Sequence, residues 1–377
     1  MDIKFSAPEQ VSILVVDSGG HDISELFAPL FRNASYACIE PKKLGGHITI
    51  SVMLRTIYYS LLTRRVLVGY ITALVRSIRP SIVITFVDNS LLFQRLARHH
   101  KNKGPRFLAI QNGVRMLTRD NPKGTSQVYH SEFACLGQHD VDQYKRHGAQ
   151  VDYFYPIGSL RDAYYRERQP RPPAIKRFDL CLISQIKPQH YKVYPQTMRS
   201  LTLLAQHLKR FCATHGTTLC IAARRHPETN ARLFEWEKNW FHEHIGAQAE
   251  VIPNAPGEYT SYALVDQSRV SLAQHTTLLH EGFGRGNRVM SCNFTGDPQY
   301  DFPVEGPWKL NTPDYEAFEA QLLRLLKMSD DEYSRQAGRW PQYLIGYNPA
   351  APTHHFLQQL IADAIQGLPL HNPRLAS

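Results

Sequence analysis

The sequence predicts an α/β protein made of two doubly wound domains, each organised around a parallel sheet. Three observations lead to this fold class. Apolar runs such as Val11–Val16 lack polar alternation, which is typical of strands buried on both faces. Strand-like and helix-like segments alternate along the chain, and the alternation restarts after a proline-rich segment. A chain of 377 residues is also long enough for two cores.

In the first half, strand-like runs are separated by segments whose apolar residues recur at helical spacing. The expected strands are Val11–Val16, Tyr36–Ile39, Ser81–Phe86, Arg106–Ile110, Phe133–Leu136 and Val151–Tyr155. The expected helices are Glu25–Arg32, most of Ile48–Ile78, Ser90–His99 and Gln138–His147. Residues 1–165 are therefore expected to form the first domain. Residues 166–177, with Pro170, Pro172 and Pro173 among charges, are expected to form a linker.

The second half repeats the pattern. The expected strands are Phe178–Ile183, Thr218–Ala223, Glu250–Ile252, Arg269–Ala273 and Arg288–Cys292. The expected helices are Tyr194–His215, Asn230–Ile245, Glu258–Asp266, Thr277–Gly284, Tyr315–Met328, Asp330–Gly338 and Thr353–Gln366. Residues 178–345 are expected to form the second domain, and 346–377 a C-terminal helix and tail. Ligands of doubly wound sheets bind at the carboxyl ends of the strands, so the polar turns there are the candidate site residues.

Composition excludes several classes of protein. Hydrophobic residues make up 43% and charged residues 20%, as in a folded globular protein. The six cysteines lack pairing or zinc-ligand spacing, which indicates reduced thiols in a cytoplasmic protein and no zinc cluster. The N-terminus lacks the apolar segment of a signal peptide. The longest uncharged run of the apolar region, Val66–Val75, is shorter than the ~20 residues that span a bilayer.

The chain is basic, with a net charge of +10. Nucleic acid, an anionic membrane surface and phosphorylated substrates are the partners that such a charge favours. The basic residues are spread out and no nucleic-acid-binding module is present, so we expect no nucleic-acid partner. Arginines recur through His47–Pro80, which favours peripheral association with an anionic membrane. The alternative is that the charge serves solubility alone.

Three polar turns end strands of the first half. They contain Asp17 with Gly19 and Gly20, Asp88 with Asn89, and Gln111, Asn112 and Gly113 with Arg115. A carboxylate in such a turn suits a general base that deprotonates a sugar hydroxyl, so Asp88 and Asp17 are the candidate bases. Gln111 and Asn112 are expected beside them as a catalytic polar cluster. Gly19, Gly20, Asn89, Gly113 and Arg115 are expected to contact an acceptor. The alternatives are plain tight turns and helix caps.

Three further turns end strands of the second half. They contain Ser184 with Gln185, Arg224 and Arg225 with His226 and Pro227, and His275 with Thr276, Thr277 and Glu281. Pro227 restricts His226 to an extended conformation at the strand end, where its ring can donate to a phosphate. Thr276 is a good N-cap, and the N–H groups behind it can bind an anion. The alternatives are ordinary helix-start chemistry at Pro227 and a capping box at Thr276.

Taken together, these motifs resemble those of bacterial glycosyltransferases of GT-B architecture that build surface polysaccharide, either lipopolysaccharide O-antigen or capsule. The His226-Pro227 turn and the Thr276-Thr277 pair are also similar to motifs of Kdo transferases and bacterial sialyltransferases, which use CMP-activated sugars. The resemblance implies two Rossmann-like domains with an interdomain cleft. It also implies that His226 contacts the CMP phosphate, that the threonines hold phosphate or the donor carboxylate, and that Glu281 holds ribose.

The first half departs from that pattern. Gln111 and Asn112 stand where those families often have an acidic pair before the glycine. Since an amide cannot act as a base, the resemblance leaves that role to Asp88 or Asp17.

The sequence thus predicts a metal-independent glycosyltransferase without a cofactor, cytoplasmic and peripheral at the inner membrane. It would move Kdo or a related 2-keto acid sugar from a CMP donor to a lipid-linked or growing surface glycan. Four alternatives stay open: a UDP- or GDP-hexose transferase of the same fold, a UDP-sugar 2-epimerase, a CDP-polyol glycerophosphotransferase-like enzyme, and a non-enzymatic protein that binds nucleotide-sugars.

Overall fold

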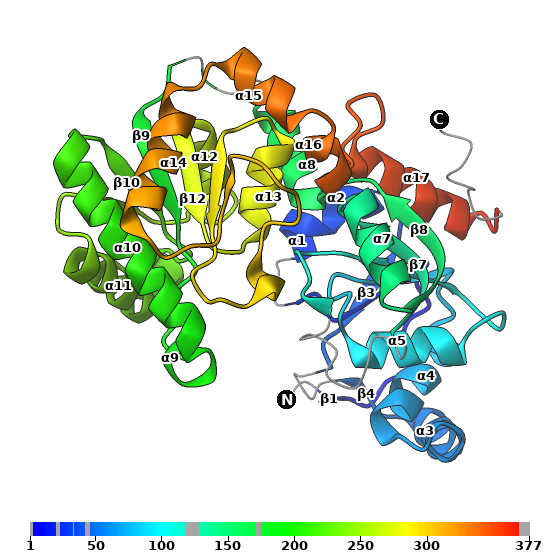
Figure 1. The fold of residues 1–377 in the computed structure, drawn as a ribbon. Coiled ribbons are helices and arrows are strands. Elements are labelled where there is room, and N and C mark those ends of the chain that lie inside the picture. The colour runs from blue at the N-terminus through cyan, green and yellow to red at the C-terminus, as the bar shows by residue number, and fades with distance from the viewer. Residues whose placement is uncertain are drawn as a thin grey trace. The chain divides into compact units, whose positions relative to one another are not determined.

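The computed structural model describes residues 3–19, 23–32, 34–41, 46–117, 128–170, 173 and 175–368. The chain divides into two compact units (Figure 1). The first contains residues 1–163 and 346–377, and the second contains residues 164–345. Helix α8 (Leu160–Arg168) leads from one to the other and extends into the segment that the prolines predict as a linker.

The first unit is built on a parallel sheet of six strands. In spatial order they are β3 (Tyr36–Ile39), β2 (Ile13–Val16), β5 (Ile82–Thr85), β6 (Arg106–Ile110), β7 (Tyr129–Cys135) and β8 (Gln150–Pro156). Its helices are α1 (Ile23–Leu26), α2 (Ala28–Phe31), α3 (Ile50–Thr63), α4 (Val66–Ile78), α5 (Leu91–His99), α7 (Gln138–Arg146) and α17 (Thr353–Ile365). The short strands β1 (Ile3–Lys4) and β4 (Gly46–His47) pair separately. The strand order reverses direction between β2 and β5, and ligands bind at such a reversal in doubly wound sheets.

The second unit repeats this design with the strand order β11-β10-β9-β12-β13-β14. The strands are β9 (Phe178–Ile183), β10 (Leu219–Ala222), β11 (Glu250–Ile252), β12 (Ser268–Ala273), β13 (Val289–Cys292) and β14 (Lys309–Leu310). The helices are α9 (His190–Val193), α10 (Pro195–His215), α11 (Pro227–His244), α12 (Thr260–Asp266), α13 (Thr277–Gly284), α14 (Tyr315–Lys327), α15 (Asp330–Ala337), α16 (Trp340–Leu344) and the 3₁₀ turn η2 (Pro298–Tyr300). Here the order reverses between β9 and β12.

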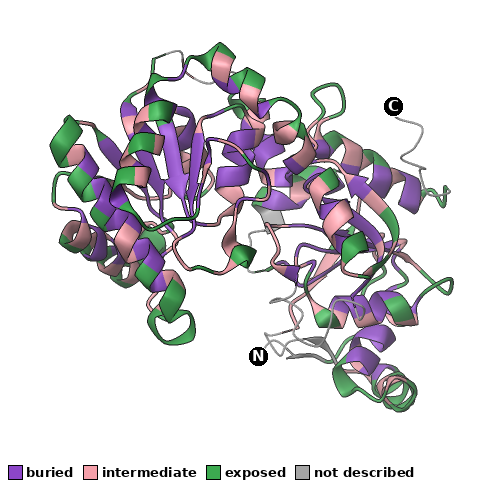
Figure 2. Cartoon of the chain, viewed as in Figure 1, coloured by how far each residue is buried: buried purple, intermediate pink, exposed green. Residues whose placement is uncertain are grey.

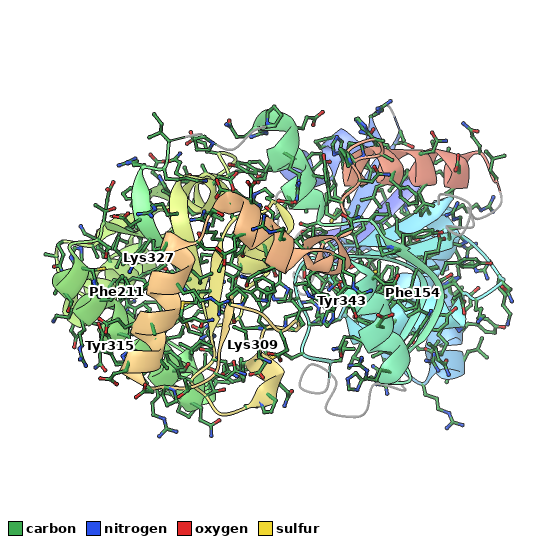
Figure 3. The ribbon with its side chains drawn as sticks, turned by 45° about the horizontal axis from the view of Figure 1, so that its top comes forward. Phe154, Phe211, Lys309, Tyr315, Lys327 and Tyr343 are labelled. Atoms are coloured by element: carbon green, nitrogen blue, oxygen red, sulfur yellow. The ribbon has the colours of Figure 1, made fainter. Side chains whose placement is uncertain are left out.

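Burial explains why the strands are continuous apolar runs. All four residues of β2 and of β5 are buried, because helices cover both faces of the sheet. In the second unit, β10 and β13 are buried in the same way (Figure 2). Between α10 and α14, the Phe211 and Phe318 rings meet edge to face with centroids 6.2 Å apart, and Arg210 lies over the Tyr315 ring. Figure 3 labels Phe211 on α10 and Tyr315 on α14. The predicted fold class is confirmed: each unit is a doubly wound parallel sheet.

Several boundaries differ from the predicted ones. The expected helix over Ile48–Ile78 is two helices, because Arg64 adopts a left-handed conformation with φ 55° and ends α3. The helix expected from Asn230 begins earlier, at Pro227. The C-terminal helix α17 packs in the first unit, where Gln358 donates to the carbonyl of Pro29 at 2.9 Å.

All six cysteines are free thiols. No helix in the described part of the chain combines the length and apolarity needed to cross a bilayer.

Candidate functional site

In the second unit, one glutamine ties together the two loops at the reversal of strand order. Gln185 follows β9, and its Oε1 accepts hydrogen bonds from the backbone N–H groups of Gln274 at 2.7 Å and His275 at 3.2 Å, which follow β12. Its Nε2 donates to the carbonyl of His275. The predicted residues Gln185 and His275 are therefore neighbours, and the loop that leads to Thr276 is held in a fixed position.

The loop after β10 is tied to the same place by Glu237, a fully buried carboxylate on α11. Glu237 accepts hydrogen bonds from the hydroxyl of Ser184, from the backbone N–H of Arg224 at 3.0 Å, and from the guanidinium of Arg225 at 3.2 Å. The structure thus brings the predicted Ser184, Arg224 and Arg225 together. The sequence did not identify Glu237, because the feature that marks it out is its burial beside Arg225.

His226 is the N-cap of α11 and Pro227 is its first residue. The imidazole Nδ1 accepts a hydrogen bond from the N–H of Glu228 at 3.3 Å. The helix-start role that the sequence offered as the alternative for this turn is therefore present. This bond also fixes the ring, because in the neutral imidazole an accepting Nδ1 leaves the proton on Nε2. His226 therefore presents a hydrogen-bond donor at Nε2, as an anion-binding role requires.

Thr276 is the N-cap of α13 and has an extended backbone, with φ −150° and ψ 145°. Its hydroxyl makes no capping hydrogen bond to the described residues of the helix, so the alternative of a capping box is not realised there. Thr276 and Thr277 are half-buried at the positive end of the helix dipole. Glu281 lies one turn further along α13 and is only 2% exposed.

Gln274, the last residue before this loop, is a further candidate that sequence reasoning missed. It is 1% exposed, and neither atom of its carboxamide has a hydrogen-bond partner among the described residues. A buried amide without partners is costly, and a ligand at the strand ends is one way of satisfying it.

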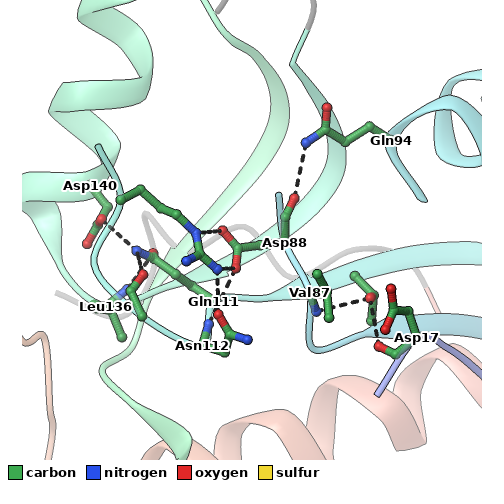
Figure 4. A network of polar contacts seen from close by, with 11 residues as sticks. Asp17, Val87, Asp88, Gln94, Gln111, Asn112, Leu136 and Asp140 are labelled. Atoms are coloured by element: carbon green, nitrogen blue, oxygen red, sulfur yellow. Dashed lines mark hydrogen bonds and ion pairs between the residues drawn. The ribbon is translucent and has the colours of Figure 1, made fainter. Parts of the chain in front are cut away.

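In the first unit, Asp17 follows β2 at the reversal of strand order. Its backbone has φ 66°, a conformation that few residues other than glycine adopt. The hydroxyl of Thr85 donates to its carbonyl at 3.2 Å (Figure 4). Oδ1 of its side chain accepts from the N–H of Gly19 at 3.1 Å. Gly19 is exposed, and Gly20 lies outside the described residues.

Asp88 does not occupy the open position that a general base requires. It is completely buried, and both of its carboxylate oxygens accept from Arg115, one of them at 2.7 Å (Figure 4). The backbone N–H of Asn112 donates to the same carboxylate at 3.4 Å, and the side-chain Oδ1 of Asn112 accepts from Arg115. These contacts make Asp88 an anchor for Arg115. Asn89 beside it is exposed, and Ser90 is the residue that caps α5.

Gln111 is also committed to the protein itself. Its Nε2 donates to the carbonyl of Gly113 at 2.9 Å and to Asp140 at 2.8 Å, while its Oε1 accepts from the N–H of Leu136 at 3.2 Å. All of its principal hydrogen-bonding positions are thereby used, so it positions the loop and is not available to an acceptor. Asp140 was not predicted from the sequence. Its burial raises the pKa of the carboxyl to about 7.

A protein-family model matches residues 108–359, more than half of the chain, and its description is "putative O-antigen biosynthesis protein". The chain belongs to this O-antigen biosynthesis family. No curated protein matches it.

Solved structures share the fold of this O-antigen family member. MnaA from S. aureus, in a co-structure with UDP, is 10% identical over 99% of each chain, with a TM-score of 0.56. Anabaena HepE in complex with UDP-glucose is 10% identical over 95% of this chain and all of its own, with a TM-score of 0.50. The wall teichoic acid polymerase TagF, as an H444N variant with CDPG, is 11% identical over 94% and 89%, with a TM-score of 0.51. The shared architecture is the GT-B arrangement of two Rossmann-like domains.

Proposed function

We propose that this O-antigen family member is a glycosyltransferase that moves a sugar from a nucleotide-sugar to a lipid-linked or growing surface glycan. One observation carries the proposal. The loops that end β9, β10 and β12 are joined through Gln185 and Glu237, and they place hydroxyl, imidazole and guanidinium groups at the strand reversal of the second unit. Such donors suit the diphosphate or monophosphate of a nucleotide.

The donor phosphate is proposed to lie at the N-terminus of α13. Helix N–H groups favour an anion there, and the Thr276 hydroxyl makes no capping bond within the described helix. Nε2 of His226 and the guanidiniums of Arg224 and Arg225 would stabilise the negative charge that develops on the leaving phosphate. Glu281 is proposed as the acceptor for ribose hydroxyls. With this number of cationic donors the proposal requires no metal ion.

The first choice of donor is CMP-Kdo or a related CMP-linked 2-keto acid sugar, on the basis of the His226-Pro227 turn and the Thr276-Thr277 pair. A UDP- or GDP-hexose is the alternative. The presence of UDP in the MnaA structure and of UDP-glucose in the HepE structure gives a reason to test uridine nucleotides equally.

For the catalytic base we propose Asp17, because Asp88 is occupied by Arg115. Strained backbone at a strand reversal is characteristic of functional residues, and Asp17 has both features. Asp88, Gln111 and Asn112 would act through the shape of the loop that carries Arg115. Gly19, Gly20, Asn89, Gly113 and Arg115 are proposed to contact the acceptor. The lipid-linked acceptor also makes a peripheral position at the inner membrane part of the proposal.

A panel of CMP, CDP, UDP and GDP tests the donor site through the thermal stability of the protein. A ligand that binds only the folded state raises the unfolding free energy by RT ln(1 + [L]/Kd). We expect a selective shift with CMP in the wild type and a clear loss of that shift in Thr276→Val, which removes the hydroxyl but keeps the side-chain shape. Thr202→Val is the matched control, since the Thr202 hydroxyl donates to the carbonyl of Met198 within α10.

A shift with UDP or GDP would keep the glycosyltransferase but discard the 2-keto acid donor. No shift with any nucleotide would contradict the proposed function. A CDP-selective shift would favour transfer of a polyol phosphate. The likeness to TagF, whose structure was determined with CDPG, is a reason to test for this reaction. Phosphorus analysis of the product separates the two reactions, because only the second adds phosphate to the acceptor.

A further inference from the structure

Helix α3 in the first unit carries an apolar stripe that faces solvent. The stripe consists of Ile50, Met53, Leu54, Ile57, Tyr58, Leu61 and Leu62, whose exposed fractions lie between 53% and 79%. Their spacing of three and four residues places them on one side of the helix. Such a stripe normally faces the protein core, but α3 is drawn almost entirely as exposed or half-exposed (Figure 2). Val66 and Leu67, at the start of α4, extend the apolar patch.

The other side of α3 packs on α4, and its polar groups are satisfied locally. Thr56 and Thr63 donate to carbonyls one turn earlier in the helix, those of Val52 and Tyr59, at 2.7 and 2.8 Å. Val52 is the buried residue of the helix. At the crossing point, a Cβ atom on Gly69 of α4 would lie 2.5 Å from the backbone nitrogen of Ser60. Because only glycine fits there, the two helices interlock and the stripe is held outward.

All charged residues of the segment that carries the stripe are basic. The arginines of this region are Arg55, Arg64, Arg65, Arg76 and Arg79, and no aspartate or glutamate occurs between residues 41 and 87. None of these arginines forms an ion pair with a carboxylate in the described part of the chain. Arginines without carboxylate partners around an apolar stripe are complementary to a surface in which phosphate groups cover a hydrocarbon layer.

A pocket of about 630 Å³ opens beside α3 and is lined by Arg55, Arg76 and Arg79 together with Tyr59 and Ser81. Arg55 donates to the hydroxyl of Ser77 at 3.0 Å, which orients its guanidinium. The lining contains no acidic residue. Three guanidiniums around one pocket are suited to bind a phosphate group.

We propose that α3 is a membrane-docking helix that lies in the interface of an anionic phospholipid bilayer. Its apolar stripe is immersed among the acyl chains, and Arg55, Arg76 and Arg79 bind lipid phosphates. A second copy of the chain is the poorer occupant, because a symmetric contact through α3 would bring the arginines of both copies together without any carboxylate to oppose them. This inference rests on the peripheral membrane position of the proposed function and specifies the helix responsible; its test concerns the first unit and does not require the transfer reaction.

Flotation of the full-length protein with vesicles tests the proposal. The wild type is expected to float with vesicles that contain phosphatidylglycerol, and to bind pure phosphatidylcholine vesicles much less. Ile57→Ser combined with Leu61→Ser is expected to lower the partition coefficient roughly tenfold or more, because two aliphatic side chains no longer insert. Ile175→Ser is the control, since Ile175 is an exposed isoleucine of the second unit, with an exposed fraction of 87%.

A second variant tests the charge. Arg55→Gln with Arg79→Gln is expected to reduce the preference for anionic vesicles and its sensitivity to salt, while the stripe remains. Unfolding curves should be unchanged in the serine variant, since the substituted side chains are exposed, and its nucleotide-induced thermal shift should be that of the wild type. Equal flotation of wild type and serine variant would overturn the proposal. So would a wild-type dimer that the serine variant disrupts, without any vesicle binding.

Discussion

At the scale of single residues, the two candidate aspartates of the first unit differ in what surrounds them. Asp88 has both oxygens on Arg115 and no exposed surface, whereas Asp17 carries a left-handed backbone at the reversal of strand order. The spacing of the sequence places both at strand ends. It does not reveal which of them is neutralised, because Arg115 comes from the loop after another strand.

Substitution of each aspartate by asparagine separates these roles. Asn tolerates the left-handed backbone of Asp17, so Asp17→Asn should fold normally but lose transfer by about 10²-fold or more, as expected for removal of a general base. Asp88→Asn should instead lower the unfolding free energy by about 3 kcal/mol, because Arg115 loses its buried carboxylate partner. Activity with the donor found in the nucleotide panel, together with urea unfolding curves, measures both effects. Wild-type transfer by Asp17→Asn would remove Asp17 from the mechanism.

His130 gives a prediction about pH. It is fully buried against Phe133, with ring centroids 4.6 Å apart, and its ring nitrogens have no partner among the described residues. Burial lowers the pKa of His130 from 6.5 to about 4. As the pH falls, His130 is therefore protonated in the unfolded chain at a higher pH than in the folded protein. The unfolding free energy should drop by about 3 kcal/mol between pH 6.5 and 4 as a result.

His130→Phe should lower the slope of the unfolding free energy against pH over that interval by about one proton, which urea unfolding at a series of pH values would reveal. The comparison must be made between variant and wild type, because Asp140, whose pKa is raised to about 7 by burial, has the opposite slope over most of the same interval. Identical slopes in the two proteins would show that His130 is not charged on unfolding in this range.

At the scale of elements, the sequence predicts which segments form strands and helices better than it predicts where each helix begins, ends or faces. The apolar runs of β2 and β5 are visible because buried parallel strands tolerate few polar residues. The split between α3 and α4 depends on the left-handed Arg64, which no composition signal marks. The outward face of α3 depends on the contact between Gly69 and Ser60, a tertiary feature that helical spacing does not contain.

The candidate site shows the same limit. Turn residues such as His226 and Thr276 are recognisable because proline and hydroxyl residues follow apolar runs. Glu237 is one of several charges along α11, and nothing in the helical spacing distinguishes it from its neighbours. Its role comes from the contacts with Ser184 and Arg225, which lie far apart in the chain.

At the scale of the whole molecule, the alternation of elements predicts two doubly wound units, and the comparisons place the chain in an O-antigen biosynthesis family with a GT-B fold. The strand orders could not be predicted from the sequence, since the pairing between strands depends on tertiary contacts. These orders decide where each reversal lies, and in the second unit the loops that flank the reversal are joined through Gln185.

The central claim is that the second unit binds a nucleotide-sugar through the loops after β9, β10 and β12. Isothermal titration of the nucleotide selected by the panel into wild type and His226→Ala tests it most directly. Loss of the His226 cap alone should cost about 1 kcal/mol of stability, so Ser329→Ala, which removes the N-cap bond of α15 in the same unit, is the matched control. We expect Ser329→Ala to bind as the wild type does and His226→Ala to bind roughly tenfold more weakly or worse, because a donor to the phosphate is lost. Binding of wild-type strength by a folded His226→Ala variant would contradict the account.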